Sequence, residues 1–241
     1  MNKSSQEQSI KYYNTEASKY ELIRSRDVEM EHNFAVGCLG GINSFYKWKT
    51  ILDVGSGTGF VLRQMMSLMP DSTFRGIEPS EGMRREGYKQ GIPEMVLTAG
   101  DAHDLEFEDN TFDCVTAFGV MHHLHHPKKA LSEMIRVSKH AVFVSDMNNF
   151  GCGSLIQRCF SHALGGLGLW KLFQFLKNGG KLSKFSAGDG VHYSYSLFED
   201  LGVFKKHGMD VRIISTRPTS RNLFWSCSHV AVLGTKKDIS K

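Results

Sequence analysis

The chain has 241 residues and carries 29 lysines and arginines against 25 aspartates and glutamates, which leaves a formal net charge of +4. Hydrophobic residues make up 41% and charged residues 22% of the chain, which excludes a collagen, a disordered chain and a disulfide-rich miniprotein. This length predicts one or two domains.

The predicted secondary structure begins with a helical segment and continues as alternating strands and helices. Residues 1–45 look helical and precede the first strand. From Thr50 to Met147, short apolar runs alternate with helical patterns, which is typical of β-α-β units and a parallel sheet. Apolar residues at helical spacing predict helices over 61–69 and 130–137. The predicted strands are residues 51–54, 74–78, 95–98, 112–118 and 141–145.

The alternation ends after the fifth predicted strand. Residues 148–190 interrupt it with two apolar helical stripes that Gly165 and Gly166 separate. A predicted helix over residues 196–207 then comes before two β-rich runs, 209–215 and 226–233. Because no helical pattern lies between these runs, we expect an antiparallel pair that closes the sheet.

The cysteines and the apolar stretches bear on the cellular compartment. The five cysteines are an odd number, are widely spaced and form no C-x-x-C pair, so we expect neither a disulfide framework nor a thiolate zinc site. The first residues lack the apolar region of a secretory signal. The longest nearly apolar stretch, residues 163–176, is shorter than the roughly 20 residues of a membrane span. We therefore expect a soluble protein of the reducing cytoplasm.

A glycine-rich turn follows the first predicted strand, in the run Asp53-Val54-Gly55-Ser56-Gly57-Thr58-Gly59. Glycine is needed where a turn is tight and the backbone approaches a ligand that a Cβ would hold away. Glu78 follows nineteen residues after Gly59, at the end of the second predicted strand, where an acid accepts hydrogen bonds from both hydroxyls of a ribose. A turn without a ligand is the alternative, but this context favours a nucleoside.

The spacing of the glycines separates two kinds of nucleoside ligand. The pyrophosphate fingerprint is G-x-G-x-x-G, whereas this chain has G-x-G-x-G with Asp53 two residues before the first glycine. A carboxylate repels a pyrophosphate but attracts an ammonium or a sulfonium group. The pattern therefore favours a nucleoside with a positively charged tail over the dinucleotide of a nicotinamide-dependent oxidoreductase.

Four ordered motifs resemble those of the class I S-adenosylmethionine-dependent methyltransferases, in particular the small-molecule group called methyltransferase type 11. They are D-V-G-S-G-T-G at 53–59, G-I-E-P-S at 76–80, G-D-A at 100–102 and F-D-C-V-T-A-F-G-V-M-H-H-L at 112–124. The resemblance covers about residues 45–147 and the helix and strands after 196. It is specific for the fold and the cofactor, S-adenosyl-L-methionine, and unspecific for the acceptor.

The resemblance implies an α/β fold, a Rossmann-like three-layer sandwich with a mostly parallel seven-stranded sheet, an antiparallel closing strand and a helical cap insert. The expected divisions are an N-terminal helical lid segment (1–45), the cofactor-binding core (46–147), the helical cap or substrate insert (148–190) and the C-terminal part of the core sheet (191–241).

The resemblance also implies which residues bind the cofactor. Asp53 would organise its amino-acid end, Glu78 would hold the ribose hydroxyls, and Asp101 with the Ala102 amide would read the adenine edge. A helix N-cap is the alternative for Asp101. Tyr20 lies in a segment that in this family folds over the cofactor, with a plain surface helix as the alternative. The full expected set is Tyr20, Asp53, Gly55, Ser56, Gly57, Gly59, Glu78, Pro79, Asp101, Ala102 and Phe118.

Four histidines, His122, His123, His125 and His126, follow the fourth predicted strand, where the reactive methyl group should project. His122 and His126 are spaced as neighbours on a helix, but Pro127 disfavours such a helix and no cysteine or carboxylate follows closely, so we expect no metal. A structural role for the H-H-L motif is a second alternative.

The third alternative for these histidines is catalysis. Methyl transfer is an in-line displacement at a sulfonium, so most of the rate should come from alignment, and a base matters only for a protonated acceptor. His122 is our first candidate base and His125 our second. We expect His122→Ala to lose turnover and to keep cofactor binding.

The acceptor is indicated by what the chain lacks and by its net charge. Residues 118–121 do not carry the N/D-P-P-Y/F motif of nucleic-acid-base methyltransferases, so we expect no nucleic-acid partner. Residues 148–190 hold five basic residues against Asp189 alone, which accounts for the whole net charge. We expect two cap helices packed over the site, with peripheral membrane contact through this insert as the alternative. Either arrangement favours an anionic or lipid-linked acceptor.

The leading hypothesis is an enzyme of the EC 2.1.1 class. It would move a methyl group to an O or N nucleophile of a small-molecule acceptor, such as a natural product, a sugar or a lipid-linked metabolite. The alternatives are a non-catalytic, S-adenosylmethionine-binding regulatory protein and the nicotinamide-dependent oxidoreductase.

Overall fold

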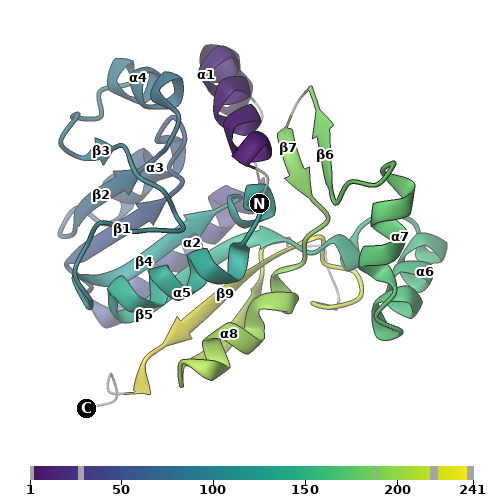
Figure 1. Cartoon of the computed structure of the whole chain (residues 1–241). Helices are drawn as coiled ribbons and strands as arrows, with labels where there is room; N and C mark the ends of the chain where they lie inside the picture. The colour runs from purple at the N-terminus through teal and green to yellow at the C-terminus, as the bar shows by residue number, and fades with distance from the viewer. Residues whose placement is uncertain (1–2, 27–29, 188, 218–221, 238–241) are drawn as a thin grey trace.

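The computed structural model describes residues 3–26, 30–187, 189–217 and 222–237. One seven-stranded sheet forms its centre, in the order β3-β2-β1-β4-β5-β9-β8 (Figure 1). The strands are β1 (Thr50–Val54), β2 (Thr73–Ile77), β3 (Leu97–Thr98), β4 (Phe112–Phe118), β5 (Ser138–Met147), β8 (Asp210–Ser215) and β9 (His229–Thr235).

The direction of the strands confirms the predicted sheet. β1 to β5 pair in parallel, and β9 is antiparallel to both of its neighbours, β5 and β8. Most residues of the central strands β1 and β4 are buried, because helices cover both faces of the sheet. The mostly parallel sheet with one antiparallel closing strand is therefore confirmed.

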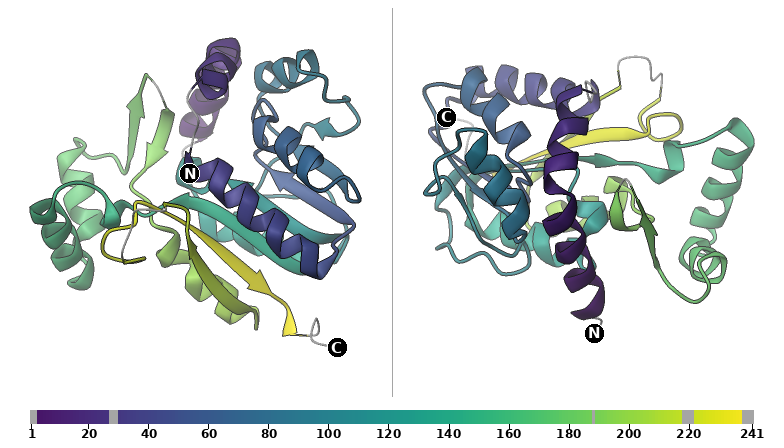
Figure 2. Two further views of the ribbon diagram at one scale, coloured as in Figure 1. Left: turned by 180° about the vertical axis from the view of Figure 1, so that it is seen from behind. Right: turned by 90° about the horizontal axis from the view of Figure 1, so that it is seen from above.

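Helices cover the two faces of the sheet and make a three-layer structure (Figures 1 and 2). On one face lie α2 (Met30–Tyr46), α3 (Phe60–Leu68) and α4 (Glu81–Lys89), and on the other lie α5 (Pro127–Val137) and α8 (Leu201–Lys206). Ala130, Leu131 and Met134 recur at helical spacing in α5 and are fully buried against the sheet. The single helix predicted over 196–207 is divided into the 3₁₀ helix η3 (Leu197–Asp200) and α8.

Helix α1 (Lys3–Arg26) lies across one edge of the sheet, between α4 and the hairpin of β6 and β7 (Figure 1). Seen from above, it crosses the middle of the molecule (Figure 2). This is the edge at which β1, β2, β3 and β4 end. α1 therefore covers the loops that follow these strands, and it is separate from the layers that cover the sheet faces.

The insert differs from the expected cap. It contains the 3₁₀ helix η2 (Asn149–Gly151), α6 (Leu155–Gly166), α7 (Trp170–Lys177) and β6 (Ser183–Ser186), which forms a hairpin with β7 (Gly190–Tyr193) at the end of the insert. α6 and α7 lie at the side of the molecule remote from β1, β2 and β3 (Figures 1 and 2). The ring of Phe150 anchors them, since it packs against His162 of α6 and Trp170 of α7. No helix of the described residues is long and apolar enough to cross a membrane.

Candidate functional site

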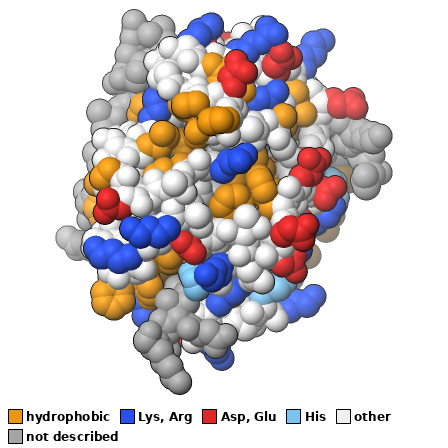
Figure 3. Space-filling view, turned by 90° about the vertical axis from the view of Figure 1, so that its left-hand side faces the viewer, with side chains coloured by type: hydrophobic (Ala, Val, Ile, Leu, Met, Phe, Trp, Pro, Cys, Tyr) orange, Lys and Arg blue, Asp and Glu red, His pale blue; other side chains and the backbone are white. Residues whose placement is uncertain are grey.

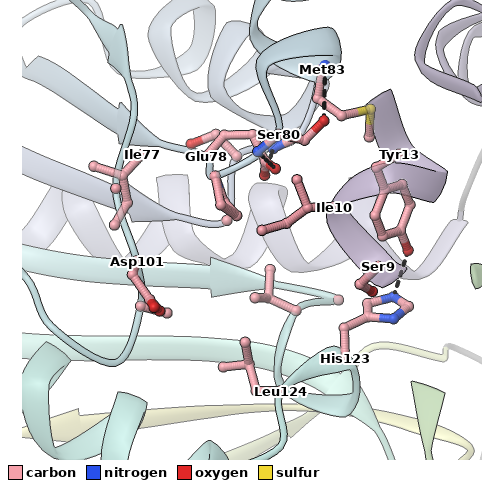
Figure 4. Close-up of a pocket in the computed structure, with 18 of the residues that line it drawn as sticks. Ser9, Ile10, Tyr13, Ile77, Glu78, Ser80, Met83, Asp101, His123 and Leu124 are labelled. Carbon is pink, nitrogen blue, oxygen red and sulfur yellow. Dashed lines mark hydrogen bonds between the residues drawn. The ribbon is translucent and has the colours of Figure 1, made fainter. Parts of the chain in front are cut away.

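A pocket lies where the carboxyl ends of four parallel strands meet. In an open α/β sheet, ligands bind at the point where the strand order reverses, and here that point lies between β1 and β4. The loops after β1, β2, β3 and β4 line the pocket, and α1 lines it from another side with Ser9, Ile10 and Tyr13 (Figure 4). Its empty space amounts to about 1220 Å³, including the part that is open to solvent.

The glycine-rich loop after β1 is held against the end of β2. Gly55 and Gly57 both have positive φ angles, of 72° and 57°, which glycine adopts without a steric cost. The Gly57 N–H donates to Glu78 Oε2 at 3.0 Å, and the Ser80 N–H donates to Glu78 Oε1 at 2.8 Å. Glu78 is only 8% exposed and still lines the pocket. Its carboxylate is thus fixed in one orientation by two backbone donors.

Asp53 is the second buried acid of the pocket. It is 2% exposed, and its Oδ1 accepts a hydrogen bond of 2.9 Å from the Thr116 hydroxyl on the neighbouring strand β4. Burial raises the pKa of Asp53 to about 6 and the pKa of Glu78 to about 7. Two desolvated carboxyl groups in one pocket attract a ligand that brings positive charge or hydroxyl donors.

Asp101 lies at the end of the pocket away from His123 (Figure 4). Its Oδ1 accepts from the His103 N–H at 2.9 Å, and its Oδ2 accepts from Gln6 Nε2 of α1 at 3.0 Å. The side chain therefore stabilises its own turn, which does not continue as a helix, and lines the pocket. Its contact with the adenine edge stays a prediction. Pro79, Ala102 and Phe118 line the pocket as well.

Polar contacts hold α1 over the pocket. Buried Glu21 pairs with Arg63 of α3 at 2.5 Å and accepts a hydrogen bond from the Thr58 hydroxyl in the glycine-rich loop. At the other side, Asn14 Oδ1 accepts from the Ser80 hydroxyl at 2.9 Å and from the Gly82 N–H at 2.8 Å. These contacts place the expected residue Tyr20 and four further residues of α1 at the pocket. The α1 residues that line the pocket are Gln6, Ser9, Ile10, Tyr13 and Tyr20.

His123 lies at the opposite end of the pocket from Asp101, and its Nε2 is 3.2 Å from the Tyr13 hydroxyl (Figure 4). His125 also lines the pocket, but it lies nearer Asp101, with which it lines a second hollow. Nδ1 of His123 is 2.8 Å from the Val191 carbonyl of β7. His125 Nδ1 is 3.1 Å from the hydroxyl of Tyr193, also in β7. The hairpin of the insert thus reaches the site, although α6 and α7 do not.

His122 occupies a different position, behind His123. Its Nδ1 is 2.7 Å from Oδ1 of buried Asp146 at the end of β5, and its Nε2 is 3.8 Å from Oδ2 of Asp189 in the hairpin. Burial alone would lower the pKa of His122, but the two carboxylates outweigh it and raise this pKa to about 10. Burial and the neighbouring charge of His122 lower the pKa of His123 to about 4.

Comparison with known proteins identifies the domain. Residues 52–144 match the family described as methyltransferase domain. They form a class I S-adenosylmethionine-dependent methyltransferase domain. The chain is 37% identical over 105 residues to a demethylmenaquinone methyltransferase of Renibacterium salmoninarum, which is 44% of this chain and 40% of that protein. The chain thus spans about two fifths of the length of this curated relative.

Solved structures share the fold over nearly the whole chain. An S-adenosylmethionine-dependent methyltransferase of Thermotoga maritima, titled a possible histamine N-methyltransferase, has a TM-score of 0.55 at 20% identity and covers 94% of this chain and 99% of that one. A plantazolicin methyltransferase in complex with S-adenosylhomocysteine has a TM-score of 0.57 at 14% identity and covers 98% and 99%. At these identities the likeness concerns the fold.

Most of the expected cofactor residues of the methyltransferase domain line the pocket, and two of the expected site residues do not. Gly59, at a φ of 73°, is not among the lining residues; it begins α3, and a Cβ there would lie 2.0 Å from Ile92 Cδ1. His122, our first candidate base, does not line the pocket either, because its side chain turns back to Asp146. The two helices expected to cap the site do not line it, since the described lining includes no residue of 148–190.

Sequence reasoning missed the contacts that α1 and the hairpin bring to the site. Asn14 and Glu21 stand in a helix without a motif, and no local signal distinguishes them. Asp146 and Asp189 lie far from His122 along the chain, and only the fold brings them to it. The position of Asp146 at the carboxyl end of a predicted strand was the one available signal.

Proposed function

We propose that this protein transfers the methyl group of S-adenosylmethionine to a small-molecule acceptor. The observation that supports the proposal is the pair of buried acids, Asp53 and Glu78, which line one pocket at the carboxyl ends of β1 and β2. In the reaction, an O or N nucleophile forms a bond to the methyl carbon while the bond from this carbon to sulfur breaks. The sulfonium becomes the neutral sulfur of S-adenosylhomocysteine, and the acceptor loses a proton.

Each of several pocket residues has a separate proposed role in binding the cofactor. The Asp53 carboxylate would neutralise the positive amino-acid end of the cofactor, Glu78 would accept from the ribose hydroxyls, and Asp101 with Ala102 would read the adenine edge. The acceptor would then lie at the histidine end. Most of the rate would come from holding the nucleophile in line with the sulfur–methyl bond in a pocket that α1 shields from water.

His125 is the proposed recipient of the acceptor's proton. It lines the pocket, whereas His122 is turned away and paired with Asp146. A positioning role for His122, through the orientation of its neighbour His123, is consistent with loss of turnover on His122→Ala. Both roles stay predictions.

The affinity for the cofactor should depend on pH. Because the pKa of Glu78 is about 7 and that of Asp53 about 6, we expect the Kd of S-adenosylhomocysteine to rise by about 100-fold from pH 8 to pH 5.5 as both acids take up protons. Calorimetric titration across this range measures it. The unliganded protein should show the opposite trend, since its folded state binds these protons more tightly than the unfolded chain and loses stability as the pH rises from about 4 to about 7. An affinity that is constant with pH would contradict the assignment of the two acids.

We further propose that the acceptor is lipid-linked. The relative from Renibacterium salmoninarum is named for a menaquinone precursor. The insert of this chain exposes large hydrophobic side chains, and its sequence places lysines among them. The face on the left in Figure 1 also shows hydrophobic side chains, among both basic and acidic ones (Figure 3). Exposed apolar side chains beside basic ones favour contact with an anionic membrane surface. The exposed hydrophobic residues of the insert are Leu155, Ile156, Phe160, Leu167, Leu169, Leu172, Phe175, Leu176, Leu182 and Phe185.

Charge reversal in the insert tests the membrane contact. Each lysine near an anionic surface contributes about 1 kcal/mol, so the double variant of Lys177 and Lys181 to glutamate should bind phosphatidylglycerol vesicles at least about 30-fold more weakly. The acceptor KM should rise and cofactor affinity should stay unchanged. The matched control reverses Lys205 and Lys206, which are exposed in the last turn of α8. Equal vesicle binding by both double variants would refute the contact.

One experiment separates the proposed function from its alternatives. The full chain is titrated with S-adenosylmethionine, S-adenosylhomocysteine and NAD, and an acceptor screen with radiolabelled methyl donor is run on the same sample. We expect the two sulfur nucleosides to bind and a lipid-linked acceptor to gain label. Tight binding of NAD alone would support the oxidoreductase, and cofactor binding without label on any acceptor would support the regulatory protein.

The unpaired state of all five cysteines supports the cytoplasm as the proposed location.

A further inference from the structure

Three side chains from two distant segments converge behind the histidine end of the pocket. His122 and His123 come from the 3₁₀ helix η1 (Met121–His123), and Asp189 comes from the turn of the β6–β7 hairpin. His122 Nε2 is 3.8 Å from Asp189 Oδ2, and His123 Nε2 is 3.6 Å from Asp189 Oδ1. One ligand atom from each of the three residues lies within 4.8 Å of the other two. In the sequence, no carboxylate follows the histidines closely enough to complete a metal site. In the folded chain, Asp189 provides that carboxylate.

The second nitrogen of each histidine is already engaged. His122 Nδ1 is bonded to the Asp146 carboxylate at 2.7 Å, and His123 Nδ1 is bonded to the Val191 carbonyl at 2.8 Å. A carbonyl oxygen only accepts, so the His123 Nδ1 carries the proton and its Nε2 keeps a lone pair. The Tyr13 hydroxyl lies 3.2 Å from this nitrogen, and an ion would take the place of that contact. Histidine ligands of metals show this arrangement, in which a carboxylate or carbonyl fixes the ring and the other nitrogen faces the ion.

The spacing of the three ligand atoms suits one ion. Two ligands at about 2.1 Å from an ion at a tetrahedral angle are about 3.4 Å apart. The separations from the two histidine nitrogens to the two oxygens of Asp189, 3.8 and 3.6 Å, exceed this by a few tenths of an ångström, and the three ligand atoms all lie within 4.8 Å of one another. Asp189 lies in a hairpin turn with 44% of its side chain exposed, so a shift of this residue together with small rotations of the two imidazole rings would bring the three ligands onto one ion.

The chemistry of the ligands and their charge select the ion. Two imidazole nitrogens with one carboxylate suit Zn²⁺ and similar divalent transition metals, whereas Mg²⁺ and Ca²⁺ prefer ligand sets made of oxygen alone. The carboxylates of Asp146 and Asp189 together balance the charge of a divalent ion. The competing arrangement is an ion pair in which a proton on His122 Nε2 takes the place of the ion.

We propose that His122, His123 and Asp189 bind one divalent transition-metal ion such as Zn²⁺ at the acceptor end of the pocket. Three protein ligands leave a coordination position open, as in catalytic zinc sites. His123 lines the pocket, so this position faces the space assigned to the acceptor (Figure 4). On the basis of the proposed function, the ion holds an oxygen of the acceptor, which makes hydroxyl-bearing acceptors the preferred class.

The test uses the full chain, treated with a chelator and then titrated with Zn²⁺ and with Co²⁺. The exposed thiols of Cys152 and Cys159 are replaced by serine in every sample, because free thiolates bind both ions. We expect one Zn²⁺ per chain, a visible Co²⁺ spectrum without a thiolate band, and affinity at least about 100-fold weaker in Asp189→Ala. The matched control, Asp71→Ala, removes an exposed acid remote from the site and should bind as the parent does.

Two further measurements keep the outcome decisive. His123→Ala removes a second ligand and should weaken Zn²⁺ binding as strongly as Asp189→Ala, while circular dichroism confirms that both variants fold. Absence of binding by the parent, or equal affinity in the parent and both variants, would overturn the metal site and support the ion pair. S-adenosylhomocysteine affinity is measured on the same samples and should not change in Asp189→Ala. Loss of the cofactor with retained Zn²⁺ binding would instead contradict the proposed function.

Discussion

Replacing Glu78 with glutamine is expected to weaken S-adenosylhomocysteine binding by at least about 100-fold. Both carboxylate oxygens of Glu78 already accept from backbone donors, Gly57 and Ser80, and a glutamine must turn its amide N–H₂ toward one of them. The ribose hydroxyls also lose a charged acceptor, and hydrogen bonds to a charged group contribute about 1.5–3 kcal/mol each. Two such bonds amount to about 3 kcal/mol, which corresponds to the stated change in Kd. Calorimetry on the purified variant measures the change.

The matched control for this variant is Glu81→Gln. Glu81 stands three residues further on, in the exposed first turn of α4, where it pairs with Arg85 at 2.6 Å. Exposed pairs of this kind contribute little to stability, so cofactor affinity and thermal stability should equal those of the parent. If Glu78→Gln binds S-adenosylhomocysteine as tightly as Glu81→Gln does, the ribose assignment is wrong.

A single methyl group at Gly55 is expected to damage both the loop and the pocket. Gly55 has a φ of 72°, and a Cβ there would lie 2.6 Å from Val120 Cγ2, which belongs to a residue that lines the pocket. The left-handed backbone conformation costs about 1 kcal/mol for alanine, and the contact adds to it. Gly55→Ala should therefore lose about 2 kcal/mol of unfolding free energy and at least tenfold in cofactor affinity, as chemical denaturation and calorimetry would report.

Gly91→Ala separates the two causes of this effect. Gly91 also has a positive φ, of 90°, but nothing lies within 4 Å of an added Cβ and the residue is outside the pocket. The variant should show the backbone cost alone, about 1 kcal/mol, with unchanged cofactor affinity. A Gly55→Ala variant that behaves like Gly91→Ala would mean that Val120 yields and that the close approach of the loop has no role in binding.

The fold could be predicted well where burial leaves a strong local signal. Strands β1 and β4 are covered on both faces, so they read as continuous apolar runs, and β4 has the predicted bounds 112–118. The predicted third strand was longer than the observed Leu97–Thr98, because β3 is a short edge strand and its neighbours 95 and 96 do not pair. In the insert, the apolar stripes correctly predicted helices. They did not predict where these helices lie in the fold. An apolar helix face indicates that the helix packs against some surface, but it does not indicate which surface that is.

The residues of the site could likewise be predicted only where a short local motif marks them. Asp53, Gly55, Glu78 and Asp101 could be recognised because each stands at a strand end within a short motif, and parallel strands bring their carboxyl ends to one edge. The histidine cluster could be placed near the acceptor but not resolved. Adjacent side chains diverge from one backbone, so His123 faces the pocket while His122 turns to Asp146.

The sequence by itself thus determined the alternating strands and helices of the cofactor-binding half and the acids that a nucleoside with a charged tail requires, since both depend on residues close together in the chain. The tertiary structure alone decided that Glu21 holds α1 over the pocket, that the β6–β7 hairpin brings Asp189 to His122 and His123, and that α6 and α7 lie away from the pocket. These contacts join segments far apart in the chain, and their geometry exists only after the sheet, α1 and the hairpin have packed together.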